Sequence, residues 1–161
     1  MSDQRQVQEV LARYVRAADR RDGAAMSSLF IAEARVEIHE GQQAPRQIGL
    51  IQGSGAIGAA VAGMMKPHPA GGWSHHTTHD PIIDIDGDVA TIDAQFIVYD
   101  TIGATKPAAG WPGSAFGAQG RVVPIEAGYY RSRLVREDGQ WKIDLHRIYL
   151  DLPMAFPDAG T

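Results

Sequence analysis

The sequence has no cysteine, no long apolar run and no excess of basic residues. Without cysteine, the chain has no disulfides, no catalytic thiolate and no zinc site built on cysteine. Because no run of about 18 apolar residues occurs, a membrane-spanning helix is not expected. A formal net charge of −4 gives no basic surface of the kind that nucleic-acid binding requires. We therefore expect a protein that binds neither nucleic acid nor membranes.

The composition is that of one ordinary globular domain. A chain of 161 residues can bury a real core, and a hydrophobic fraction of 44% is typical of such chains. We expect a single domain over residues 1–161 with its body at about residues 3–153. The polar residues 1–5 are not typical of a signal peptide, so a cytoplasmic location is expected.

Histidine is concentrated in one place. Three of the six histidines, His75, His76 and His79, stand within five residues, at the predicted entrance to a strand. Since the pKa of histidine is normally near neutrality, such a cluster indicates proton transfer or metal binding. Side chains alternate across a strand, so only one of His75 and His76 can face the interior. His79 has the opposite parity to His76, unless a bulge near Pro81 resets the phase.

A metal site is one alternative for this cluster. It would use His76 and His79 together with His39 or Asp80, a donor set suited to zinc or iron. The spacing of these residues is not a known ligand motif, and solvated histidines at the start of a polar strand are the ordinary alternative. We expect no metal and no cofactor.

Periodicity predicts helices first and strands later. Helical spacing predicts helices over residues 7–18, 24–30 and 55–65. Alternation predicts a strand over residues 34–40, between the second and third helices. Residues 41–50 have the composition of a loop, and Ser54 is the expected N-cap of the third helix.

Two hairpins follow. Residues 80–85 and 89–101 flank one Asp-Gly turn, and residues 121–136 and 141–150 flank another. The Gly- and Pro-rich loop 102–120 between them is long for a compact domain, which favours a rim, a lid or a partner contact. This order predicts an α+β fold in which the helices pack on one curved antiparallel sheet. Such a sheet forms a cone with a pocket at its wide end.

Two polar residues of the first helix lie on or beside its apolar stripe. Tyr14 lies on the stripe, and Asp19 lies at its edge. A carboxylate directed into an apolar interior needs a partner or a raised pKa. The ordinary alternatives are an exposed Asp19 that meets Arg16 or Arg20, and a Tyr14 that is simply a core aromatic.

Several motifs are similar to those of one family. They are Arg13-Tyr14-Val15-Arg16-Ala17-Ala18-Asp19-Arg20-Arg21-Asp22, His76-x-x-x-Asp80-Pro81, Gly87-Asp88-Val89-Ala90, Gly128-Tyr129-Tyr130 with Arg133, and Asp138-Gly139 with Trp141-Lys142-Ile143. They resemble the SnoaL-like proteins of the nuclear transport factor 2-like (NTF2-like) superfamily over roughly residues 3–153. The resemblance implies the cone-shaped, cystatin-like α+β fold, and it implies a homodimer or homotrimer.

The resemblance also implies a site. In scytalone dehydratase-like proteins, the bile-acid 7-alpha-dehydratase and lindane dehydrochlorinase, a helix-borne Asp pairs with a strand-borne His in metal-free eliminations. Asp19 and His76 match these two positions. Tyr14 matches the pocket tyrosine of the bile-acid enzyme, and His79 matches a further histidine in its strand.

The expected substrate is a small hydrophobic cyclic molecule. Arg147, Arg133 and Arg131 are all candidates for an arginine that binds it, and none aligns cleanly with the family. Phe96 and Met65 are expected to line or back the pocket. The apolar tail over residues 150–157 would cover the mouth of the cone or pack on a second subunit.

These observations lead to the hypothesis of a cofactor-independent lyase that performs a dehydratase-type elimination. His76 would act as base and acid, Asp19 would fix its tautomer, and Tyr14 or an arginine would stabilise the developing enolate. A non-catalytic ligand-binding or structural subunit, and a polyketide cyclase or isomerase, remain as alternatives. An accessible pocket with Asp19 and His76 in contact would favour the enzyme, whereas an interior filled by Trp, Phe or Met would favour the scaffold.

Overall fold

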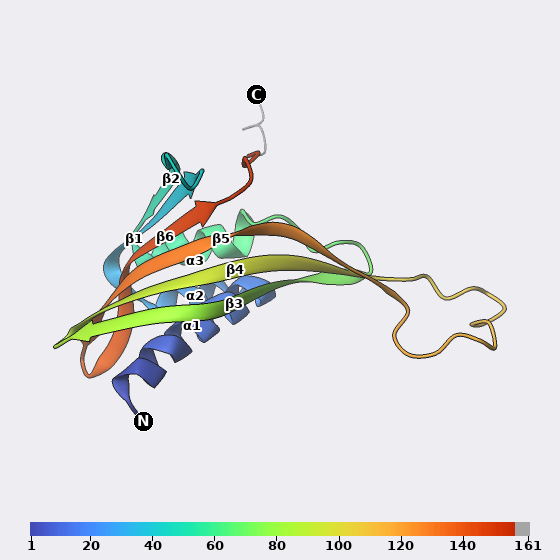
Figure 1. Ribbon diagram of the computed structural model, residues 1–161, viewed down its shortest axis with the longest axis horizontal. Coiled ribbons are helices and arrows are strands. Elements are labelled where there is room, and N and C mark those ends of the chain that lie inside the picture. The colour runs from blue at the N-terminus through green and yellow to red at the C-terminus, as the bar shows by residue number, and fades with distance from the viewer. Residues whose placement is uncertain (157–161) are drawn as a thin grey trace.

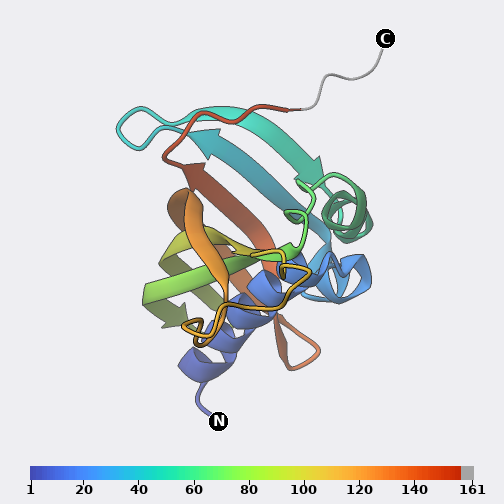
Figure 2. The same ribbon diagram turned by 90° about the vertical axis from the view of Figure 1, so that its right-hand side faces the viewer.

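A computed structural model describes residues 1–156 as helices packed on one curved, six-stranded sheet (Figure 1). Along the chain the elements are α1 (Asp3–Arg20), α2 (Gly23–Ser28), β1 (Phe30–Glu40), β2 (Arg46–Gln52), α3 (Ser54–Gly63), β3 (Gly72–Asp86), β4 (Val89–Gly103), β5 (Gly120–Glu137) and β6 (Gln140–Leu150). The strands are ordered β2-β1-β6-β5-β4-β3. Figure 2 shows the sheet curving around the helices. The predicted α+β class and curved sheet are therefore confirmed.

The first helix follows its apolar stripe. Ser2 caps it by accepting a hydrogen bond from the Arg5 N–H, and the buried face runs from Val7 to Asp19. The helix ends at Arg20, and the positive φ of 55° at the next residue, Arg21, turns the chain away. Asp22 then caps α2 by accepting from the Ala25 N–H at 2.9 Å. Two caps in succession thus produce the predicted break between these helices.

The face of the sheet that packs against α1 is called the inner face here. It carries Ala90, Ile92, Ala94, Phe96 and Val98 of β4, as the alternation of that strand predicts. On β5 the same face carries alternate residues from Glu126 to Leu134, because Val98 pairs with Glu126 and Ala90 with Leu134. The opposite, outer face carries Arg131 and Arg133 of β5.

The sequence misplaced several boundaries in the first half of the chain. Residues 46–50 belong to strand β2, not to a loop, because β2 is an edge strand with half-exposed polar residues that mask its period. The α3 N-cap is Gly53, with a φ of 91° and no capping side chain, so Ser54 is the first helical residue instead of the cap. Helix α2 ends at Ser28, and Phe30 already begins β1.

The sheet differs from the prediction in two further respects. Strand β3 begins at Gly72 rather than at residue 80, so the histidines lie inside the strand rather than at its entrance. Strand β1 pairs with β6 in parallel, so the sheet is mixed rather than purely antiparallel. This parallel pairing arises because β6 returns from the β5 hairpin alongside β1, in the same direction.

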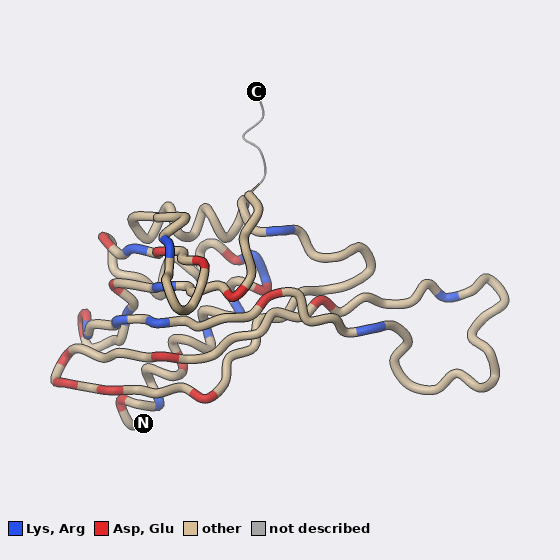
Figure 3. The backbone as a smooth tube through the Cα atoms, turned by 45° about the horizontal axis from the view of Figure 1, so that its top comes forward, with Lys and Arg blue, Asp and Glu red and all other residues tan. Residues whose placement is uncertain are grey.

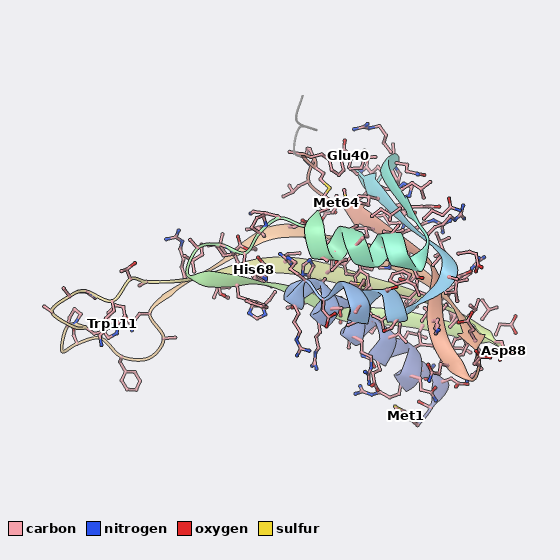
Figure 4. All side chains as sticks on the ribbon, turned by 180° about the vertical axis from the view of Figure 1, so that it is seen from behind. Met1, Glu40, Met64, His68, Asp88 and Trp111 are labelled. Carbon is pink, nitrogen blue, oxygen red and sulfur yellow. The ribbon has the colours of Figure 1, made fainter. Side chains whose placement is uncertain are left out.

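Residues 104–119 form the predicted long loop, which projects from the body between β4 and β5 (Figure 1). Lys106 is its one charged residue, and the loop is accordingly almost free of charge colours in Figure 3. Phe116 is 98% exposed, and Trp111, labelled in Figure 4, lies on the same loop. The loop therefore extends outward instead of folding over the sheet.

The described part of the C-terminal tail contacts the β1–β2 turn. Gln42 Nε2 donates to Asp151 Oδ1 at 2.7 Å, and the Met154 N–H donates to Glu40. Pro157, the last residue of the predicted apolar tail, lies outside the described residues. Within residues 1–156, no helix has both the length and the hydropathy needed to cross a membrane.

Candidate active site

Asp19 and His76 are in direct contact at the end of α1. Asp19 Oδ1 accepts one hydrogen bond from His76 Nδ1 at 2.6 Å and another from the His76 backbone N–H at 2.8 Å. Both side chains are largely buried, with exposed fractions of 13% and 10%. The inward-facing carboxylate of Asp19 is therefore hydrogen-bonded to His76. The alternative in which Asp19 pairs with Arg16 or Arg20 in solvent does not apply.

This contact orients the imidazole of His76. A carboxylate can only accept hydrogen bonds, so Nδ1 carries the proton and donates it to Asp19. In the neutral ring, Nε2 is then left with a free lone pair. The backbone N–H bond to the same oxygen holds the carboxylate in place relative to the strand. His76 therefore offers one nitrogen for proton transfer and uses the other for positioning.

The other two histidines of the cluster lie on the outer face. His75 is half exposed, and its nearest approach to Asp19 is 3.9 Å. The register of β3 against β4 shifts only between His79 and Ile82, so the bulge comes too late to turn His79 inward. His79 instead lies 3.7 Å from Asp80. The expectation that His79 contacts substrate inside the cone is corrected, because the two-residue period of the strand places it opposite to His76.

The residues of the alternative metal site do not come together. His76 faces inward and His79 outward, while His39 lies on β1 beside Glu37 and stacks on Tyr149. Among the described residues, no group of three or more His, Asp or Glu side chains is arranged to hold a metal ion.

Tyr14 lies deeper in the interior than Asp19. Its ring is 5.5 Å from that of Tyr130, 6.3 Å from that of Phe30 and 4.4 Å from the imidazole of His146. Burial raises the pKa of Tyr14 well above its usual value, so the hydroxyl remains a protonated donor. The ring thus belongs to the core, as the ordinary alternative expected, and any catalytic role would come from its hydroxyl.

The three candidate arginines lie on the outer face. They alternate with the inward-facing Tyr130, Ser132 and His146, which fixes their parity. Each makes an ion pair there: Arg131 with Asp93, Arg133 with Asp144 and Arg147 with Glu37. The expectation that Arg147 or Arg133 binds substrate inside the cone is therefore corrected.

Two cations that the sequence analysis did not select interact with the acidic residues near the end of α1. Arg21 donates to the carbonyl of Ala18 at 2.6 Å and to that of Lys66 at 2.7 Å, which ties the segment after α3 to the end of α1. Burial lowers the pKa of Arg21, and the nearby Asp19 and Asp100 carboxylates oppose that shift. Lys66 Nζ lies 3.7 Å from Asp100 Oδ2.

Two acidic residues of the inner face were also missed. Asp100 is buried and accepts from Ser74 Oγ at 2.7 Å. Glu126 pairs in register with Val98, which in turn pairs with His76, so these three residues form one row across β5, β4 and β3. Burial raises the pKa of Glu126, and the His76 and Lys66 charges partly oppose the rise. Counting back by twos from Tyr130 could have found Glu126.

His146 is a second inward histidine, fully buried in the middle of the sheet. Its Nδ1 lies 2.7 Å from Ser132 Oγ, whereas its Nε2 has no partner among the described residues. Burial lowers the pKa of His146 to about 3. The local sequence pattern around His146 does not reveal this depth.

Aromatic side chains fill the middle of the cone. Phe96 is buried and stacks on Tyr130 with ring centroids 4.2 Å apart, so it fills space instead of lining a cavity there. Met65 packs against the edge of the core, partly exposed. A shallow hollow of about 460 Å³ lies elsewhere, at the start of α1, beside Pro81 and Ile83. The interior thus combines the pairing expected of an enzyme with some of the filling expected of a scaffold.

Comparison with known proteins identifies the fold. A family model described as a SnoaL-like domain matches residues 1–147. An NTF2-like protein with a cystatin-like fold from Novosphingobium aromaticivorans is 19% identical, with a TM-score of 0.66, 92% of this chain covered and 81% of that one. No curated protein matches the chain significantly.

Two further solved structures carry functional descriptions. One, from the same organism, is a provisionally assigned beta subunit of an aromatic-ring-hydroxylating dioxygenase, 15% identical, with a TM-score of 0.67 and coverage of 94% and 90%. The other is a provisionally assigned dehydratase of the NTF2-like family from Streptomyces avermitilis, 18% identical, with a TM-score of 0.61 and coverage of 94% and 97%. At these identities the similarity shows the fold alone.

Proposed function

The chain belongs to the SnoaL-like domain family, and from this membership and the contact between Asp19 and His76 we propose that it is a lyase. The proposed reaction is a cofactor-independent elimination of water from a small hydrophobic cyclic substrate. The hydrogen bond from His76 Nδ1 to Asp19 Oδ1 is the observation that carries the proposal. It leaves the lone pair of His76 Nε2 free to accept a proton on the inner face.

His76 is proposed to remove the proton from a carbon next to a carbonyl group. Asp19 would hold the ring in the reactive tautomer and stabilise the imidazolium that forms. The hydroxyl of Tyr14 is proposed to donate to the carbonyl oxygen as negative charge develops on it. General acid–base catalysis of this kind contributes on the order of 10²- to 10⁴-fold in rate.

The burial of the pair supports a chemical role. Taking a carboxylate out of water has a cost that even a good partner only approximately offsets, so apolar packing would stabilise the fold about as well. Apolar neighbours also fit an apolar substrate: Val98 pairs with His76, and Ile125 and Met65 pack against the core. A similar protein from Streptomyces avermitilis is provisionally assigned as a dehydratase.

A non-catalytic role is the second candidate. The packing of Tyr14, Phe30, Phe96 and Tyr130 in the middle of the interior favours it. A similar protein is provisionally assigned as the beta subunit of an aromatic-ring-hydroxylating dioxygenase. A polyketide cyclase or isomerase would use the same base on a different substrate. The homodimer or homotrimer and the cytoplasmic location stay predictions, the first of which light scattering tests.

The test is an elimination assay on cyclic β-hydroxy ketones, with 3-hydroxycyclohexanone as the first probe. We expect the wild type to form the conjugated enone and His76→Ala and Asp19→Asn each to lower the rate about 10²-fold or more. The substitution His79→Ala, on the outer face of the same strand, is the matched control and should leave the rate unchanged.

Full activity in either site variant would contradict the proposal. Loss of wild-type activity on chelation, restored by added metal, would contradict its metal-free form. If the wild type binds the ketone but neither it nor any variant converts it, the non-catalytic role is favoured instead.

A further inference from the structure

Glu126 occupies a position on the inner face that the proposed reaction does not yet use. It lies next to the point where the register between β4 and β5 shifts. It pairs with Val98, which also pairs with His76. Residues paired in register across a sheet point to the same face, so the side chains of Glu126 and His76 flank that of Val98. Adjacent strands are about 4.8 Å apart, which separates the two backbones by roughly 10 Å. A small ring bound between these two side chains would have one of these groups on each side.

The surroundings of Glu126 differ from those of the other carboxylates nearby. Asp19 accepts from His76, and Asp100 accepts from Ser74 and lies beside Lys66. Glu126 has no hydrogen bond or ion pair to another side chain among the described residues, although it is partly buried. Its burial raises its pKa, whereas the His76 and Lys66 charges only partly oppose that rise. Glu126 is thus the carboxyl of this region best suited to hold a proton and free to give it away.

We propose that Glu126 is the catalytic acid that protonates the departing hydroxyl group, opposite His76. This inference rests on the proposed function and adds to it a second proton-transfer residue. His76 would otherwise have to act twice through Nε2 alone, because its Nδ1 is bound to Asp19. Tyr14 is a poorer acid for this step, since burial raises its pKa further.

The step balances with these two groups. The C–H bond next to the carbonyl breaks, its proton goes to His76 Nε2, and its electron pair forms the carbon–carbon double bond. The C–O bond breaks with its electrons on oxygen, which takes the proton of Glu126 and leaves as water. The imidazolium then returns its proton to the Glu126 carboxylate through water, which restores both groups without any co-reactant.

Two probes that differ only in the leaving group test this assignment. 3-Hydroxycyclohexanone loses hydroxide, which needs an acid, whereas 3-(4-nitrophenoxy)cyclohexanone loses 4-nitrophenoxide, a stable anion that needs none. Both require the base. We expect Glu126→Gln to lower kcat on the hydroxy probe about 10²-fold or more and to leave kcat on the nitrophenoxy probe within about threefold of wild type. His76→Ala should lower both.

Matched variants separate this role from a structural one. Glu137→Gln makes the same change on the same strand, in an exposed pair with Lys142, and should change neither rate. Glu126→Asp keeps an acid and should recover part of the hydroxide-specific loss. Equal losses of Glu126→Gln on both probes, or no loss on either, would overturn the inference while the proposed function stood. Failure of the wild type on both probes would overturn the proposed function itself.

Discussion

His76 and His146 are both inward-facing, largely buried histidines, yet they occupy two different chemical environments. His76, at the end of α1, meets a carboxylate and has another carboxyl across the sheet. His146, in the middle of the sheet, meets only the hydroxyl of Ser132 and the rings of two tyrosines. A carboxylate partner stabilises an imidazolium, whereas an apolar shell disfavours it. The same side chain is thus suited to proton transfer in one region and to neutral packing in the other.

The largest expected contrast is in the pH dependence of stability. The pKa of His146 is about 3 in the folded protein against an ordinary 6.5, so below pH 6.5 the unfolded chain binds a proton that the folded chain does not. Stability should therefore fall as the pH drops from 6.5 towards 3, by on the order of 4 to 5 kcal/mol from this group alone. Urea unfolding at several pH values measures the loss.

His146→Leu isolates this contribution. The variant should lose less stability than the wild type between pH 6.5 and 4, because it has no buried imidazole to protonate on unfolding. Other groups act in the same direction, since arginine hydrogen bonds lower the pKa values of Glu9 and Asp3. Equal losses in the variant and the wild type would mean that His146 titrates normally, and the contrast with His76 would then disappear.

Tyr14 packs against His146 but is also proposed to act together with His76, so it tests the comparison between these two histidines. We expect Tyr14→Phe to lower kcat on 3-hydroxycyclohexanone about 10²-fold, because the hydroxyl would stabilise the enolate oxygen. The melting temperature should change little, since the ring packing on Tyr130 and His146 is kept. An unchanged kcat would assign Tyr14 to the core together with His146.

The smallest effect is expected on the outer face. Arg147 is 41% exposed and pairs with Glu37, and such pairs contribute about 1 kcal/mol or less. Arg147→Ala should therefore lower stability slightly in urea unfolding and leave the elimination rate unchanged. A large fall in the rate would show that this arginine reaches the substrate after all, and the division between the two faces would need revision.

The sequence predicted the fold correctly where the hydrophobic period of an element matches the burial of its residues. Strand β4 alternates apolar and polar residues and was placed within two residues of its observed end, whereas β2 and the first part of β3 were missed. Both missed segments are polar or lie at a sheet edge, where neighbouring strands supply the pairing and local composition gives little signal. The parallel pairing of β1 with β6 depends on where the chain returns, which no local pattern encodes.

The candidate site was predicted unevenly for similar reasons. Strand parity placed His75 and His76 on opposite faces, but the choice of His76 as the inward one and its pairing with Asp19, 57 residues away, came from the resemblance to a family. The assignment of Arg147 and Arg133 to substrate binding was wrong because the parity of β5 and β6 relative to the core was not applied to them. Glu126 and Asp100 follow from that same parity, so counting by twos from the buried tyrosine and valine would have improved the site.

In the sequence, the projecting loop lies between the proposed base and the proposed acid. Gly103 pairs with Gly120, so the β4–β5 ladder closes before residues 104–119 begin, and the loop's ends are held by the sheet. Exposed loops of this kind tolerate new chain ends. A break there would put Asp19 and His76 on one fragment and Glu126 on the other, and the β4–β5 and β1–β6 pairings would join the two fragments. The proposed base and the proposed acid would then meet only after the two fragments reassemble.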